Sequence, residues 1–101
     1  MQFAIDDVAA GDAIVGELLT NRLVACAQTI GPVTSRYWWG GSINHAQEWL
    51  FLCKTTPERL ADVIECIRSG HPYDTPEIIA SDITACLDAY LDWIVAETGS
   101  G

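Results

Sequence analysis

The chain has 101 residues, enough for one domain around a single core, and half of them are hydrophobic. Fourteen acidic residues outnumber five basic ones, and the net charge of −9 disfavours nucleic-acid phosphates and anionic lipid as partners. No apolar run approaches the roughly 20 residues that span a bilayer. We therefore expect neither a nucleic-acid partner nor a membrane partner.

The start of the chain lacks the basic residues of an export signal. The four cysteines are far apart and form no C-x-x-C pair, at Cys26, Cys53, Cys66 and Cys86. Without an export signal we expect reduced thiols and a cytoplasmic protein. The patterns around the last three cysteines predict small core residues.

Residues 1–5 are short and apolar and predict a strand, and residues 8–21 predict a helix with Asp7 as its N-cap. Apolar residues recur in this helix at Ala10, Ile14 and Leu18. Gly11 and Gly16 each cost a helix about 1 kcal/mol relative to alanine. The helix should therefore depend on packing against a sheet.

Residues 22–55 predict one long, bent β-hairpin. Its outward arm is the strand "RLVACAQTI" followed by "VTSRYWW", and Gly31-Pro32 between them predicts a bulge or bend, because proline cannot donate to a ladder. The stretch "GGSINHAQ" predicts a flexible turn, with His45 in solvent, and "EWLFLCKT" predicts the returning strand.

Thr55 and Glu58 have the spacing of a capping box, and a helix follows from about Leu60 to Gly70. The stretch "PEIIASDI" predicts a strand, residues 87–94 a closing helix, and "ETGSG" a tail. The order β-α-β-β-α-β plus a helix indicates an α+β, ferredoxin-like fold in one domain, residues 1–101, with an extra C-terminal helix and a long bent hairpin.

The hairpin is unusually aromatic, with Tyr37, Trp38 and Trp39 in succession and Trp49 and Phe51 on the returning strand. A chain of this size has little core in which to bury so many rings, and exposed apolar edges invite pairing with another chain. We therefore expect oligomerisation by edge pairing. The alternative is that the rings pack under the closing helix with Trp93.

Four stretches together, "NRLVACAQTIGPVTSRYWWGG", "EWLFLCKT", "HPYDTPEIIA" and "YLDWI", resemble the CutA family of divalent-cation tolerance proteins. The resemblance covers most of residues 21–94. It implies a homotrimer assembled through the long hairpins and a protein that responds to copper and other divalent ions. The architecture is also similar to that of the trimeric PII signalling proteins, which bind small molecules in clefts between subunits.

This chain departs from the family pattern in several places. It has Gly31-Pro32 where the family usually has Pro-Gly, and it has Gly40 where the family usually has a glutamate before the hairpin glycine. Some members carry a cysteine on the first strand and a second histidine beside the one in "HPY", but here that strand is "MQFAI" and the neighbour is Gly70. A copper site that uses those groups is therefore only partly present.

The stretch "SGHPYDTPE" supplies the candidate metal ligands. His71 offers an imidazole, Glu77 an oxygen and Cys26 a soft sulfur, and we expect these three to bind copper or another divalent ion weakly. We expect the cleft to be lined by Tyr37, Trp39, Lys54 and Tyr73. The alternative for His71 is structural, with its ring bonded to a backbone carbonyl.

No nucleophile–base–acid arrangement and no phosphate loop is recognisable, so we expect no enzymatic activity. The leading hypothesis is a homotrimeric, cytoplasmic, CutA-like protein that binds divalent metal at a subunit cleft. The alternative is a PII-like signalling trimer that holds a small anionic ligand through Lys54 and Arg36. A trimeric scaffold without a ligand is a third hypothesis.

Overall fold

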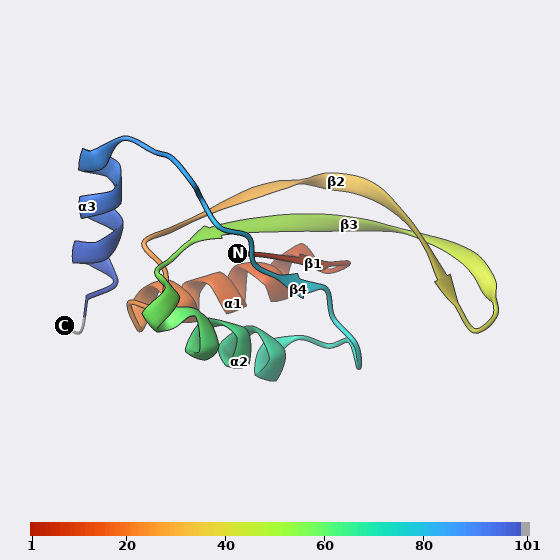
Figure 1. The fold of residues 1–101 in the computed structure, drawn as a ribbon. Coiled ribbons are helices and arrows are strands. Elements are labelled where there is room, and N and C mark those ends of the chain that lie inside the picture. Colours follow the sequence, from red (N-terminus) through yellow and green to blue (C-terminus); the bar gives the residue numbers. More distant parts are fainter. Residues whose placement is uncertain (100–101) are drawn as a thin grey trace.

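The computed structural model describes residues 1–99, and its elements follow the predicted order (Figure 1). These elements are β1 (Gln2–Ile5), α1 (Val8–Thr20), β2 (Cys26–Trp39), β3 (Ser42–Lys54), a turn of 3-10 helix (Pro57–Arg59), α2 (Leu60–Gly70), β4 (Ile78–Ile79) and α3 (Asp88–Glu97). The strands form one antiparallel sheet in the order β2-β3-β1-β4. With α1 and α2 on one face of the sheet, the predicted ferredoxin-like α+β fold is confirmed.

The core lies between the sheet and the two helices α1 and α2. Phe3 of β1 and Phe51 of β3 stack with ring centroids 4.9 Å apart at its centre. The other buried members come from both layers: Ile5, Ile14, Leu18, Val24, Cys53, Val63 and Ile67. Burial raises the pKa of the Cys53 thiol to about 11, as expected for a cysteine that acts as a core residue. Cys86 is exposed, so the prediction of a core position for it is wrong.

Helix α1 begins as predicted and lies very close to the sheet. The Asp7 carboxylate accepts hydrogen bonds from the backbone N–H groups of Ala9 and Ala10, at 3.0 and 3.2 Å. A Cβ at Gly11 would overlap the ring of Phe51, whereas a Cβ at Gly16 would meet no atom within 4 Å. Gly11 therefore permits the close helix–sheet contact, and Gly16 has no such role.

The long hairpin is confirmed, with a shorter turn than predicted. The register of β2 against β3 shifts between Ile30 and Val33, which places the predicted bulge at Gly31-Pro32. Gly40 and Gly41 both have positive φ angles, +59° and +81°, and form a two-residue turn of the kind that matches the twist of hairpin strands. Strand β3 therefore starts at Ser42, and His45 is an exposed strand residue instead of a turn residue.

The predicted capping box before α2 is wrong. The side chain of Thr55 donates instead to the carbonyl of Leu23, at 2.7 Å, and the helical segment begins with the 3-10 turn after Thr56. At the other end, α2 finishes at Gly70 as predicted. A Cβ there would lie 3.1 Å from Cγ1 of Ile14, so this glycine lets α2 approach α1.

The C-terminal part differs most from the prediction. Only Ile78–Ile79 of the predicted strand 76–83 pairs with the sheet, and an exposed segment without regular structure leads to α3. Part of the predicted tail is ordered: Thr98 caps α3 and its carbonyl accepts a 2.8 Å hydrogen bond from the Arg59 guanidinium. Residues 100–101 of that tail lie outside the described residues.

Helix α3 lies at the end of the molecule opposite the hairpin tip, so the hairpin rings do not pack beneath it (Figure 1). Instead α3 is held near the base of β2, where Tyr90 Oη and Cys26 Sγ are 3.5 Å apart. The side chains of Trp38 and Trp39 are left 72% and 61% exposed. Among the described residues, no helix is long and apolar enough to cross a membrane.

The two α1 glycines give a matched test of the close packing. Gly11→Ala should lower the free energy of unfolding by about 1–3 kcal/mol, because the added methyl group would overpack the core. Gly16→Ala, on the open side of the same helix, should leave it unchanged or raise it by up to about 1 kcal/mol. Urea unfolding at equal chain concentration measures both. Equal stability of the two variants would contradict the packing described for Gly11.

Candidate functional site

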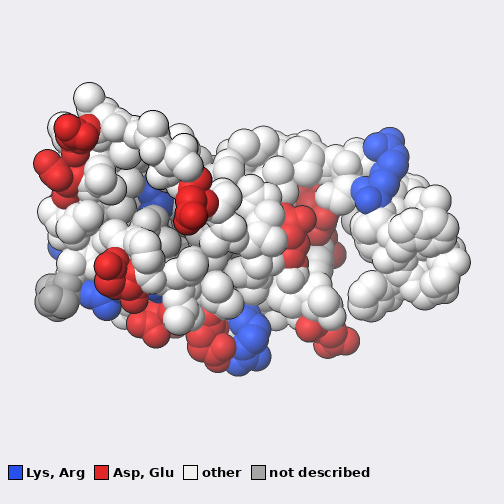
Figure 2. Space-filling model, viewed as in Figure 1, with Lys and Arg blue, Asp and Glu red and all other residues white. Residues whose placement is uncertain are grey.

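A hollow separates the hairpin tip from the body of the molecule, and acidic side chains border it (Figure 2). It has a volume of about 680 Å³ and lies between the outer part of β2 and β3, the end of β1 and the segment that leads from α2 to β4. The bulge and the tight turn of the hairpin direct its tip over this space, and the segment 71–77 forms the opposite wall.

The ionisable groups of the pocket are mainly acidic. Four carboxylates line it, those of Asp6, Glu48, Asp74 and Glu77. Against them stands one guanidinium, that of Arg36. The local charge therefore favours cations over anions, in the same sense as the charge of the whole chain.

Glu48 lies deepest among these acids, and its side chain joins the two walls. The residue is 9% exposed, and its Oε2 accepts a 2.9 Å hydrogen bond from the Tyr73 hydroxyl. Burial of Tyr73, together with this bond to a carboxylate, raises the pKa of the phenol above its ordinary value. The neutral phenol is therefore a stable donor that holds the segment 71–77 against β3.

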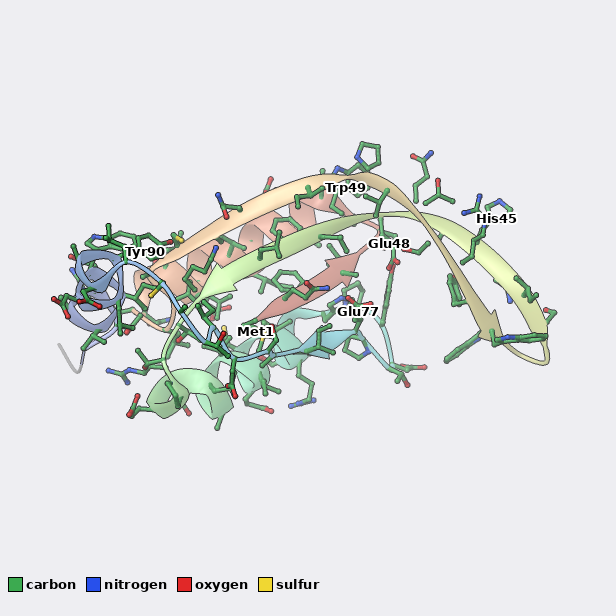
Figure 3. The ribbon with its side chains drawn as sticks, turned by 45° about the horizontal axis from the view of Figure 1, so that its top comes forward. Met1, His45, Glu48, Trp49, Glu77 and Tyr90 are labelled. Atoms are coloured by element: carbon green, nitrogen blue, oxygen red, sulfur yellow. The ribbon has the colours of Figure 1, made fainter. Side chains whose placement is uncertain are left out.

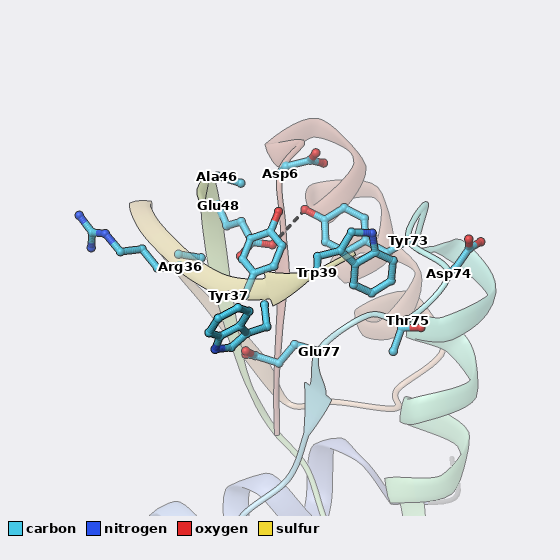
Figure 4. A pocket seen from close by; sticks show the side chains of 12 residues that line it. Asp6, Arg36, Tyr37, Trp39, Ala46, Glu48, Tyr73, Asp74, Thr75 and Glu77 are labelled. Atoms are coloured by element: carbon cyan, nitrogen blue, oxygen red, sulfur yellow. Dashed lines mark hydrogen bonds between the residues drawn. The ribbon is translucent and has the colours of Figure 1, made fainter. Parts of the chain in front are cut away.

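Aromatic rings form another part of the pocket wall. Tyr37 and Trp39 alternate with Arg36 and Trp38 along β2, so these two rings extend from the same face of the hairpin. In Figure 4 Tyr37, Trp39 and Tyr73 extend into the pocket with the Glu48 carboxylate among them. The predicted cleft residues Tyr37, Trp39 and Tyr73 thus line one pocket.

The His71 side chain forms hydrogen bonds to two backbone groups. Its ring is 8% exposed, and Nε2 lies 2.7 Å from the carbonyl oxygen of Ala4, which identifies Nε2 as the protonated nitrogen. Nδ1 accepts a 3.1 Å hydrogen bond from the backbone N–H of Tyr73. Both ring nitrogens are therefore occupied, and this geometry matches the structural alternative for His71.

Cys26 and Lys54 lie at the base of the hairpin, away from the pocket. They are cross-strand neighbours, Cys26 beside Tyr90 and Lys54 donating to the Gln28 side chain at 3.1 Å. His71 bonds to Ala4, and Ala4 pairs with Leu50 of β3. Leu50 is four residues from Lys54, so His71 and the pair Cys26–Lys54 are separated by about 13 Å along β3. Figure 3 shows Tyr90, the neighbour of Cys26, at one end of the molecule and Glu77 near its middle.

The three predicted ligands are thus not assembled within one chain. Glu77 lines the pocket, where it accepts a 3.2 Å hydrogen bond from Gln2 Nε2, but His71 and Cys26 do not line it. Within residues 1–99, no group of three or more His, Cys, Asp or Glu side chains is arranged to hold a metal ion. Within these residues the predicted divalent ion therefore has no complete ligand set, and the ligand assignment stays a prediction.

Two of the acidic residues that line the pocket, Asp6 and Glu48, are not among the predicted site residues. In the sequence Asp6 only ends the first strand, and Glu48 begins the returning strand. A signal for Glu48 was present, since it is a charged residue at the head of the apolar run "WLFLC". Its partner could not be read, because Tyr73 is 25 residues away and reaches it only in the folded chain.

Comparison with known proteins gives one consistent result. The model of the CutA1 divalent ion tolerance protein family matches residues 1–97. The divalent-cation tolerance protein CutA of Escherichia coli is 34% identical over 90 residues, which cover 89% of this chain and 80% of the relative.

Solved structures agree in fold. The divalent cation tolerance protein of Thermus thermophilus superposes with a TM-score of 0.93 at 34% identity, covering 97% of this chain and 95% of that one. CutA1 of Oryza sativa superposes with the same TM-score at 29% identity, covering 99% and 92%. With a family model that matches nearly the whole sequence and relatives above 30% identity, the chain belongs to the CutA1 divalent ion tolerance family.

Proposed function

We propose that this chain acts in tolerance of divalent cations as a homotrimer that binds copper or another divalent ion weakly, at or near a cleft between subunits. The family supplies the role in cation tolerance. The trimer, the metal and its ligands are the parts that we propose.

The observation that carries the proposal is the uncovered aromatic tip of the hairpin. Trp38, Trp39 and Ile43 are 72%, 61% and 66% exposed, beyond the reach of α1 and α2. Most of the surface that Figure 2 shows over the hairpin tip is uncharged. A contiguous apolar surface of this kind favours contact with another protein surface over contact with water.

The sheet has two different edges, which favours a ring. Strand β2 forms one edge and β4 the other, so each lacks a partner on its outer side. Contact between two unlike surfaces is heterologous, and it closes into a cyclic oligomer when the rotation allows. The value of three comes from the family resemblance.

Among the predicted ligands, Glu77 requires the least rearrangement. His71 would bind a metal only by giving up one of its two backbone hydrogen bonds, and Cys26 would have to come from a neighbouring subunit. Glu77 is exposed and retains free lone pairs on its carboxylate. We therefore propose that Glu77 contributes most to the affinity, which is weak because the ligand set is incomplete.

The proposal includes a cytoplasmic location and no catalytic role. All four cysteines are free, one of them exposed, which suits a reducing compartment. The geometry does not favour the PII-like alternative. Arg36 lies in an acidic pocket, and Lys54 lies at the opposite end of the hairpin, so one chain does not bring the two cations together.

The hairpin tip should decide assembly. We expect the variant Trp38→Ser/Trp39→Ser to dissociate at a chain concentration at least about tenfold above that of the parent, because buried interface tryptophans typically contribute about 2 kcal/mol or more each. Leu19→Ser, at a 42% exposed position on α1, is the matched control and should not change the concentration at which the oligomer dissociates. Sedimentation across a dilution series measures this. A double variant that assembles as tightly as the control would refute assembly through the tip.

Copper affinity should depend on Glu77. In calorimetric titrations with cupric ion, we expect Glu77→Gln to weaken binding by about tenfold or more. Glu58→Gln makes the same charge change at an exposed site outside the pocket and should have no effect. Equal affinities for these two variants would remove Glu77 from the site, and an unchanged affinity in His71→Ala would remove His71.

A further inference from the structure

We propose that the pocket between the hairpin tip and the segment 71–77 binds a small organic cation with an ammonium or guanidinium head, held by the Glu48 carboxylate and by the rings around it. This proposal goes beyond divalent-ion tolerance. It requires neither the metal nor the trimer, because residues of one chain form the pocket.

One carboxylate oxygen of Glu48, the least exposed acidic residue of the pocket, has no hydrogen-bond partner. Glu48 is 91% buried, and only its Oε2 has a side-chain partner, the hydroxyl of Tyr73. Among residues 1–99, no fully buried side-chain oxygen or nitrogen lacks a hydrogen-bond partner. Oε1 of Glu48, which has no partner, is therefore not fully buried, and because Glu48 lines the pocket we infer that Oε1 can accept a charge-assisted hydrogen bond from an N–H donor there.

The walls suit an organic cation better than a bare ion. Tyr37, Trp39 and Tyr73 surround the carboxylate with aromatic surface, and a cation over such a ring is attracted by about 0.5–2 kcal/mol. Aromatic rings offer no ligand to a metal ion, and the carboxylates of the pocket do not form a group that could hold one within the described residues.

The size and charge of the pocket narrow the class of ligand. A volume of about 680 Å³ is within the range of roughly 300–1,000 Å³ that is typical of small-molecule sites. Asp6, Asp74 and Glu77 add acceptors around the deeper Glu48, so a ligand with two positive ends, such as a diamine, can be paired at both. Anions are excluded by the same four carboxylates.

Agmatine, which carries a guanidinium at one end and an ammonium at the other, is the probe. We expect saturable binding to the parent chain by calorimetry, with a change in tryptophan fluorescence. Glu48→Gln keeps an acceptor for Tyr73 but removes the charge, and it should weaken binding about tenfold. Trp39→Leu removes one aromatic ring from the pocket wall and should weaken binding about fivefold. Glu58→Gln is the charge-matched control, and N-butylurea is the neutral control ligand.

Three results would overturn the inference: no saturable binding of agmatine, equal weakening by Glu48→Gln and Glu58→Gln, or equal binding of N-butylurea. A second copy of the chain that fills the pocket would also prevent agmatine from binding, and this result too would overturn the inference. The mass of the protein in the same samples tests the proposed trimer separately from the pocket. A monomer that binds agmatine would support the cation site and refute the trimer. A trimer that does not bind agmatine would support the trimer and refute the cation site.

Discussion

Antiparallel pairing of β2 with β3 continues past the point where α1 and α2 cover the sheet, and most features of this molecule depend on that pairing. The base of the hairpin supplies Phe51 and Cys53 to the core, so the same two strands build the domain and extend beyond it. The bulge at Gly31-Pro32 and the turn at Gly40-Gly41 direct the outer half. As a result one hairpin provides an uncovered aromatic surface and one wall of a pocket.

Local chemistry in the sequence was sufficient for much of the fold. The Asp7 cap, the proline bulge and the amphipathic pattern of α2 each depend on neighbours in sequence, and each was predicted correctly. Features that depend on contacts between residues distant in sequence were not predicted correctly. Thr55 bonds to Leu23 instead of capping a helix, and the predicted strand 76–83 is reduced to Ile78–Ile79, where β1 offers it a partner.

In the candidate site, too, residues in local motifs were predicted and residues defined by distant contacts were not. Tyr37, Trp39 and Tyr73 were predicted to line a cleft and Glu77 to be a metal ligand, and all four line one pocket. They belong to two short motifs, "SRYWW" and "HPYDTPE", which can be recognised in the sequence without knowledge of the fold. Glu48 could not be assigned, since its importance comes from Tyr73 folding back onto β3. The His71 ring joins the carbonyl of Ala4 in β1 to the backbone N–H of Tyr73, a contact between distant residues that the sequence does not reveal, and its role as a ligand stays a prediction.

We propose that other copies of the chain cover the exposed tip of the hairpin. The mass of the unmodified protein in solution at micromolar concentration, measured by light scattering, tests it most directly. We expect three copies of the 11.0 kDa chain, about 33 kDa in total. A particle of 11.0 kDa that leaves Trp38 and Trp39 in water would contradict it.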